Sequence, residues 1–148
     1  PTAVVDYAHT PDALASALDA CRLHCHGKLW LVFGCGGDRD VGKRALMAKV
    51  AESKADSLII TNDNPRSEDP DAIAADIIAG LRKTTRFEKI LDRKTAVLSA
   101  LTQALADDVV LFAGKGHENY IIFGNEKQHY DERAVVKAFY LAEKEITV

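Results

Sequence analysis

The sequence predicts an α/β domain with a doubly wound, mostly parallel sheet and one antiparallel element near the C-terminus. Short, continuously apolar segments alternate along the chain with longer segments whose apolar residues recur every three or four positions. The first pattern is typical of buried strands and the second of amphipathic helices. Because alternating strands and helices build parallel sheets covered by helices, the expected arrangement is Rossmann-like.

Each expected element follows from its local pattern. Leu29–Phe33 is continuously apolar, as a strand covered on both faces should be. Pro11 and Pro70 suit the first turns of helices, and Asp131 suits the N-cap of the last helix. The expected strands lie at 3–6, 29–33, 57–60, 87–91 and 109–113, with helices at 11–25, 43–54, 70–83 and 94–105 between them. A hairpin at 120–123 and 127–130, with a Gly-Asn turn, and a helix from 131 to about 144 complete the chain.

The bulk composition is that of a soluble globular protein. The 148 residues carry a formal net charge of −3, and 47% of them are hydrophobic. This length suits one compact domain. No segment concentrates Lys and Arg as nucleic-acid binding requires, and no apolar run approaches the roughly 20 residues of a membrane span. With no signal-peptide pattern at the N-terminus, we expect one cytoplasmic domain over residues 1–148, without nucleic-acid or membrane partners.

The first residues and the cysteines add two expectations. Pro1 is not an initiator methionine and a strand begins almost at once, so we expect a fragment of a longer, multi-domain protein that carries part of an active site. The cysteines, Cys21, Cys25 and Cys35, are odd in number, which favours reduced thiols over a disulfide framework. A zinc site formed with His24 and His26 is disfavoured, because Cys21 and Cys25 lie on the expected buried helix face and a second spaced ligand pair is missing.

Four loops rich in polar groups follow apolar strands, at 6–11, 34–42, 62–66 and 114–119. In open parallel sheets the carboxyl ends of the strands meet at one edge, where ligands bind. The four loops should therefore converge on one site.

The loop at 34–42 contains a pattern that resembles a phosphate-binding P-loop. Residues 37–43 fit GxxxxGK between a strand and a helix. Arg44 stands where Mg²⁺ coordination needs Ser or Thr, and Asp38 and Asp40 would oppose phosphate oxygens. A structural loop and a loop that presents Arg39 to an anionic small molecule are the other interpretations, and the last is favoured.

The loop at 62–66 ends in Asp63, Asn64, Pro65 and Arg66. Asx-Pro sequences favour turns, and a plain turn is one interpretation. Arg66 together with Arg39 could instead hold carboxylates through bidentate pairs. Asp63 and Asn64 could receive an amino group, so the set would suit a zwitterion.

The remaining candidates are open to two interpretations each. Glu118 is either a solvated carboxylate or an acceptor for an amine; a zincin is excluded because Ile121 stands where HExxH needs its second histidine. Asp6 and His9, just after the first strand, form either a hydrogen-bonded turn with a helix cap or a nucleotide contact.

Taken together, these loops resemble the C-terminal domain of the Mur ligases, specifically the diaminopimelate-adding MurE type. The resemblance runs nearly end to end. The segments that carry it are Asp-Tyr-Ala-His-Thr-Pro-Asp at 6–12, Gly-Cys-Gly-Gly-Asp-Arg-Asp at 34–40, Gly-Lys-Arg at 42–44, Thr-Asn-Asp-Asn-Pro-Arg at 61–66, Gly-Lys-Gly-His-Glu at 114–118 and Tyr-Asp-Glu-Arg at 130–133.

The resemblance implies an ATP-dependent ligase that joins meso-diaminopimelate to UDP-N-acetylmuramoyl-L-Ala-D-Glu through an acyl phosphate, in peptidoglycan precursor synthesis. It implies ATP contacts at Asp6 and His9, with Mg²⁺ held mainly by a central domain outside this chain, so no metal site or catalytic residue is expected here and the fragment alone should be inactive. The implied diaminopimelate pocket consists of Arg39, Asp63, Asn64, Arg66, Gly114 and Glu118. Another ligase of the superfamily, such as a folylpolyglutamate synthase, and a non-catalytic nucleotide- or amino-acid-binding module are the alternatives.

Overall fold

The computed structural model describes residues 1–146 of the chain, and the side chains of residues 1–143. Its elements follow the predicted order. They are β1 (Thr2–Asp6), α1 (Pro11–Leu23), β2 (Leu29–Phe33), α2 (Gly42–Lys54), β3 (Ser57–Ile60), α3 (Pro70–Ala79), β4 (Glu88–Lys89), α4 (Arg93–Gln103), β5 (Val109–Ala113), β6 (Tyr120–Phe123), β7 (Glu126–His129) and α5 (Glu132–Ile146).

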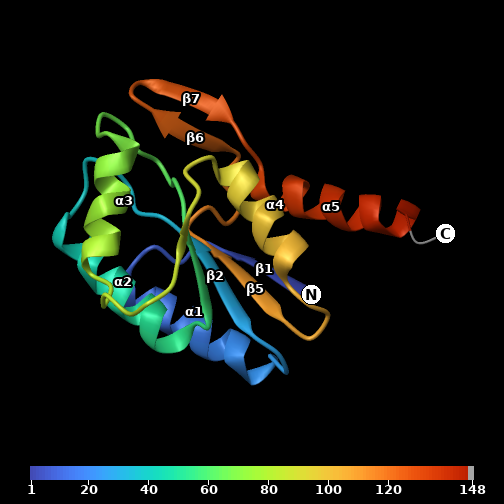
Figure 1. Cartoon of the computed structure of the whole chain (residues 1–148). Helices are drawn as coiled ribbons and strands as arrows, with labels where there is room; N and C mark the ends of the chain where they lie inside the picture. The colour runs from blue at the N-terminus through green and yellow to red at the C-terminus, as the bar shows by residue number, and fades with distance from the viewer. Residues whose placement is uncertain (147–148) are drawn as a thin grey trace.

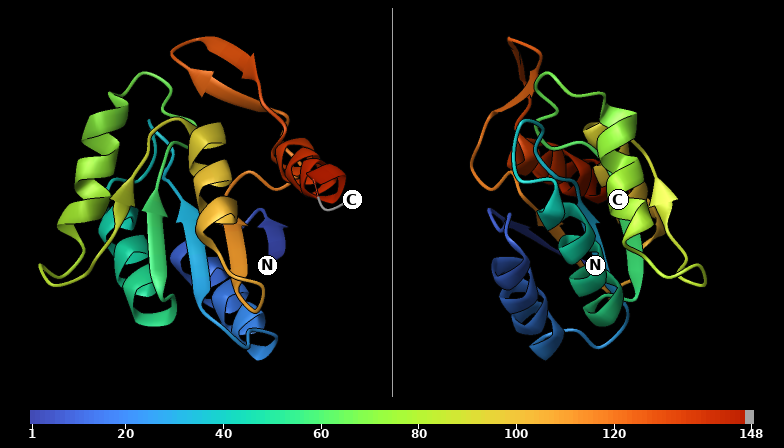
Figure 2. Two further views of the ribbon diagram at one scale, coloured as in Figure 1. Left: turned by 45° about the vertical axis from the view of Figure 1, so that its right-hand side comes forward. Right: turned by 90° about the vertical axis from the view of Figure 1, so that its left-hand side faces the viewer.

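Five strands form one parallel sheet in the order β1-β5-β2-β3-β4, and β6 and β7 form a separate antiparallel pair. The predicted α/β fold class is thereby confirmed, and the antiparallel element is a hairpin outside the main sheet. Figure 1 shows α1, α2 and α3 on one face of the sheet, and α4 and α5 on the other. The hairpin projects beyond the carboxyl ends of the strands (Figure 2).

Each face of the sheet has its own apolar core. On one face, α1, α2 and α3 pack Leu18, Met47 and Ile77 against alternate residues of the strands. On the other, α4 contributes Val97 and Leu101, and α5 adds partly buried side chains. Because β2 and β5 are covered on both sides, every one of their residues is buried.

Several boundaries differ from the predicted ones by two to four residues, which is where local patterns are least informative. Helix α3 ends at Ala79 instead of near residue 83. A Cβ on Gly80 would lie 2.7 Å from Ala45 Cα, so this end of α3 packs directly on α2 and the glycine permits the approach. Asp131 caps α5 as predicted, since its Oδ1 accepts from Ala134 N at 3.2 Å. None of the helices described between residues 1 and 146 has the length and apolar character to cross a membrane.

A buried ion pair joins the start of α4 to the start of α5. Arg93 Nε donates to Glu132 Oε1 at 2.7 Å, and both side chains are fully buried. The same guanidinium donates to the carbonyl oxygens of Asn62 and Ala113, each at 2.9 Å. Burial alone would lower the pKa of Arg93, but the Glu132 carboxylate outweighs it and the pKa is raised. This pair therefore fixes the ends of β3 and β5, where two site loops begin.

Candidate functional site

One cavity of about 320 Å³ lies at the carboxyl ends of β1, β2, β3 and β5 and is formed by the four predicted loops. Its size is within the range of small-molecule sites, about 300–1,000 Å³. Seven of the eight predicted site residues line it, Asp6 being the exception. The lining residues are Tyr7, His9, Thr10, Gly34, Cys35, Gly36, Arg39, Lys43, Asp63, Asn64, Arg66, Gly114 and Glu118.

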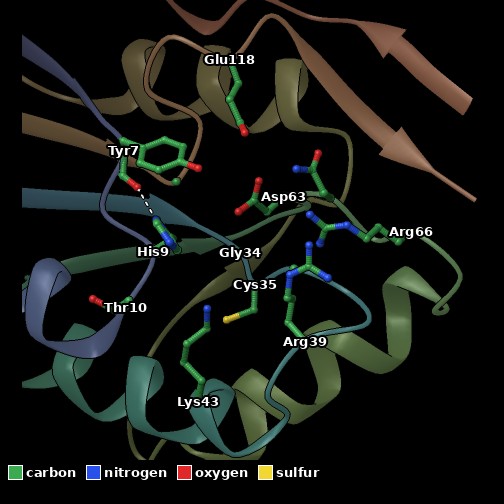
Figure 3. A pocket seen from close by; sticks show the side chains of 13 residues that line it. Tyr7, His9, Thr10, Gly34, Cys35, Arg39, Lys43, Asp63, Arg66 and Glu118 are labelled. Atoms are coloured by element: carbon green, nitrogen blue, oxygen red, sulfur yellow. Dashed lines mark hydrogen bonds between the residues drawn. The ribbon is translucent and has the colours of Figure 1, made fainter. Parts of the chain in front are cut away.

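The guanidinium groups of Arg39 and Arg66 lie next to each other at this cavity (Figure 3). A Cβ built on Gly36 would be 2.9 Å from Arg66 Nη1 and 3.6 Å from Arg39 Cγ, which places both side chains over the same glycine. Arg66 Nη1 donates to Gly37 O and Arg39 Nη1 to Asp38 O, each at 2.9 Å. One small carboxylate can therefore reach both arginines.

The loop that carries Arg66 is held by the hairpin. Arg66 adopts φ of 54°, in the left-handed region that is uncommon for residues other than glycine. Its N–H donates to Ile122 O at 3.0 Å and its carbonyl accepts from Gly124 N at 2.6 Å. The hairpin thus stabilises a backbone conformation that aims the arginine side chain at the cavity.

The neighbouring loop fits against it without side chains between them. A Cβ on Gly37 would lie 1.8 Å from Pro65 O, so only glycine permits this approach. Arg44, which is buried, pairs with Glu68 at 2.8 Å and Asp76 at 2.9 Å and donates to Gly36 O. These contacts hold the 34–42 loop in place.

Three amide groups of that loop are engaged within the protein. Gly37 N donates to Asn64 O at 2.8 Å, Asp38 N to Glu68 Oε1 at 2.9 Å and Gly42 N to Asp40 Oδ1 at 2.9 Å. A P-loop needs such N–H groups for phosphate oxygens. The GxxxxGK pattern is therefore a coincidence of sequence, as the mismatched positions indicated.

Asp63 and Glu118 point into the cavity, with Asp63 lying between Glu118 and the arginines (Figure 3). Asp63 is 7% exposed. Its Oδ1 lies 2.9 Å from Lys115 Nζ, but the angle is too poor for a hydrogen bond, and this oxygen has no other donor among the described residues. Glu118 Oε2 accepts from Tyr120 OH at 3.2 Å, and this carboxylate together with burial raises the pKa of Tyr120.

Asn64 is engaged differently from Asp63. Its Oδ1 accepts from Lys115 Nζ at 2.6 Å and from Ile122 N at 3.0 Å. The ammonium that Asn64 receives is thus that of Lys115, a residue of this chain. Gly114 begins the same segment with φ of 115°, and a Cβ there would be 3.1 Å from Asp63 Oδ2.

The two residues predicted as nucleotide contacts lie in the turn after β1. Asp6 Oδ2 accepts from Ala8 N at 2.9 Å, and Asp6 does not line the cavity. His9 lines it, and its Nδ1 lies 2.9 Å from Tyr7 O. The turn leads into α1, where Thr10 rather than Asp6 caps the helix through Ala13 N. The turn expected from sequence is present, but the cap comes from Thr10 and not from Asp6 or His9.

The sequence reasoning missed seven site residues. Six of them line the cavity and Lys115 lies beside it; the six are Tyr7, Thr10, Gly34, Cys35, Gly36 and Lys43. All lie inside the motif segments that carry the family resemblance. They could have been found because they are close to predicted site residues in the sequence. Cys35 is 4% exposed, and burial raises the pKa of its thiol to about 12. The thiol is therefore protonated at neutral pH and contributes no thiolate to the site.

The described part of the chain contains no cluster of side chains suited to bind a metal ion. Within residues 1–146, no three or more His, Cys, Asp or Glu side chains are grouped so that they fit one. Cys21 is part of the apolar core, and Cys25 Sγ donates to Gly27 O at 3.3 Å.

Comparison with known proteins shows the family of the chain. The family model described as Mur ligase, glutamate ligase domain, matches residues 1–116. A solved UDP-N-acetylmuramoyl-L-alanyl-D-glutamate–2,6-diaminopimelate ligase is 45% identical, with a TM-score of 0.91 over 96% of this chain. This chain spans 29% of the length of that ligase.

Two other solved structures share the fold at low identity. A bifunctional folylpolyglutamate synthase/dihydrofolate synthase from Yersinia pestis is 18% identical, with a TM-score of 0.60 over 95% of this chain and 28% of its own. E. coli FolC is 16% identical, with a TM-score of 0.58 over 99% of this chain and 30% of its own. The family match, the fold and the loops at the sheet edge lead to one conclusion: the chain belongs to the Mur ligase, glutamate ligase domain family.

Proposed function

We propose that residues 1–148 are the C-terminal domain of a longer, ATP-dependent ligase that adds meso-diaminopimelate to UDP-N-acetylmuramoyl-L-Ala-D-Glu. The observation that carries the proposal is the division of charge in the cavity between the adjacent guanidinium groups of Arg39 and Arg66 and the carboxylates of Asp63 and Glu118, with Lys43 as a further cation. An amino-acid terminus has one carboxylate and one ammonium side by side, and it matches this division.

The pocket's charge explains why the ligand should be diaminopimelate and not lysine. The two differ by a distal carboxylate. Without it, the exposed Arg39 and the partly buried Arg66 would have no ligand carboxylate to pair with. A site built for a polar group rejects an analogue lacking it by about 10⁴–10⁵, whereas one methylene discriminates only about 10–200-fold. Glu118, Asp63 and the Gly114 carbonyl would hold the distal ammonium.

In the proposed reaction this domain positions the nucleophile. ATP phosphorylates the γ-carboxylate of the muramyl peptide, the free amine of diaminopimelate attacks the acyl phosphate, and phosphate leaves. The acyl-phosphate step and the Mg²⁺ ion belong to the part of the enzyme outside this chain. Asp6 and His9 would contact ATP when the domains close, a contribution of proximity and orientation. We expect the whole enzyme to be cytoplasmic.

The test is amino-acid use by the full-length protein, with meso-diaminopimelate and L-lysine compared. Because Arg66 is partly buried, we expect Arg66→Ala to lower kcat/KM for diaminopimelate by about 10- to 150-fold, which corresponds to the roughly 1.5–3 kcal/mol of a hydrogen bond to a charged group. Arg82→Ala is the control, since the Arg82 side chain is 73% exposed and lies on another surface. Unchanged kinetics for diaminopimelate in Arg66→Ala would contradict the proposal.

A further inference from the structure

Lys115 is a fully buried cation beside the cavity that does not line it. Its Nζ lies 2.6 Å from Asn64 Oδ1, 2.9 Å from Asp63 Oδ1, 3.1 Å from Tyr120 O and 3.4 Å from Glu118 Oε1. Burying an ammonium costs several kcal/mol unless it is paired and hydrogen-bonded. All of these partners are pocket residues or belong to the hairpin that holds the pocket, so the charge is organised around the site.

The contacts of Lys115 fix the orientation of the Asn64 amide. Two donors, Lys115 Nζ and Ile122 N, converge on Asn64 Oδ1. Turning the amide over would put its NH₂ group against both donors, which is repulsive. Both acceptor positions of Asn64 Oδ1 are thereby occupied. The side chain can then contact a ligand only through Nδ2, which donates hydrogen bonds and does not accept them.

The charge of Lys115 also sets the net charge around the Asp63 and Glu118 carboxylates. Asp63 and Glu118 face the same region and would repel each other. Lys115 lies within 3.4 Å of an oxygen of each. With its positive charge counted, the pair has a net charge of one negative unit, which matches a single ligand ammonium.

We propose that Lys115 is a positioning residue for the amino-acid ligand: it orients Asn64 as a donor and holds Asp63 and Glu118 together as the ammonium acceptor. It acts through these three side chains and does not touch the ligand. This inference rests on the proposed function, because it assigns Lys115 a part in recognising the same amino acid.

The test uses the full-length ligase and separates the KM for meso-diaminopimelate from the KM for ATP. Lys115→Met keeps the length of the side chain and removes the charge. We expect the KM for diaminopimelate to rise by about 10- to 150-fold, the factor for losing a hydrogen bond to a charged group, while the KM for ATP changes less than about twofold. Lys127→Met is the matched control. Lys127 Nζ lies 4.5 Å from the centroid of the Tyr120 ring, but the side chain is on the exposed face of the hairpin.

A second variant decides the matter if Lys115→Met does not fold. Asn64→Asp keeps an oxygen for both Lys115 Nζ and Ile122 N, so its melting temperature should not fall. The oxygen that replaces Nδ2 can no longer donate, and the KM for diaminopimelate should again rise by about 10- to 150-fold. A KM that is unchanged or lower would show that Asn64 accepts from the ligand, and it would overturn the assigned role of Lys115.

The outcomes distinguish this inference from the proposed function. If the wild-type enzyme does not use diaminopimelate, the proposed function fails whatever Lys115 does. If the wild type uses it and a folded Lys115→Met retains the wild-type KM, only the role of Lys115 is refuted.

Discussion

Replacing Glu132 with glutamine would leave the guanidinium of Arg93 buried without its counter-charge. The substitution hardly changes the volume of the side chain, so packing is retained and the effect is electrostatic. Both side chains are fully buried, and Arg93 donates to both carboxylate oxygens, at 2.7 and 3.0 Å. Removing one partner of such a pair costs about 3–5 kcal/mol.

The effect can be measured as a loss of stability of the purified chain. For a chain of this size, about 1 kcal/mol corresponds to roughly 2–4 °C in melting temperature, so we expect Glu132→Gln to melt roughly 10 °C below the wild type. Urea unfolding followed by circular dichroism measures the free energy directly. Because Arg93 also anchors the ends of β3 and β5 through Asn62 O and Ala113 O, the loss should reach the site loops.

Two further variants complete the experiment. Lys89→Ala removes the exposed pair with Asp71, whose side chains are 42% and 62% exposed, and should cost less than about 1 kcal/mol. Arg93→Met combined with Glu132→Leu removes both charges and should recover much of the loss. If Glu132→Gln is no less stable than Lys89→Ala, the pair is not the anchor inferred here.

Three other predictions concern separate parts of the chain. Burial alone would raise the pKa of Asp108, but hydrogen bonds from Leu105 N, Lys28 N and Trp30 Nε1 outweigh it and the pKa is lowered. The ionised Asp108 therefore stabilises the fold above the unfolded pKa of about 3.9, and this stabilisation is lost as pH falls through the lower folded pKa. Asp108→Asn should destabilise the chain at pH 7 and reduce the dependence of the unfolding free energy on pH below about 4. The Cys35 thiol, with a pKa of about 12 and 4% exposure, should react with iodoacetamide at pH 8 only after unfolding, and fast labelling of the native chain would contradict its placement. The purified chain should not hydrolyse ATP, because three amides of its GxxxxGK loop are bonded internally and Arg44 stands where Mg²⁺ coordination needs Ser or Thr. Mg²⁺-dependent phosphate release above background would refute this.

The order and type of the elements could be predicted from sequence because their signals are local. The continuously apolar Leu29–Phe33 and Val109–Ala113 are buried central strands in the structure. Thr10, Asp69 and Asp92 cap helices through their side chains, as residues of these types commonly do. Strand β4 is the weakest case, with two residues instead of five, and it has no apolar pattern of its own.

The composition of the candidate site could be predicted because strand polarity brings four loops to one edge of a parallel sheet, whatever the details of packing. Which polar groups of the site are already paired within the protein could not be predicted. Lys115 was part of a quoted motif, yet nothing in the residues around it shows that its ammonium reaches 51 positions back along the chain to Asn64. Arg93 and Glu132 are 39 residues apart and each would pass as a surface charge on its helix.

The sequence by itself therefore determined the fold class and which loops meet, since hydrophobic periodicity and chain direction are properties of short segments. Only the tertiary structure decided which charges are buried and which oxygen of a carboxylate or amide is already engaged. These depend on contacts between residues far apart in the chain, and the desolvation that makes them strong exists only after the sheet and its two helical layers have closed over them.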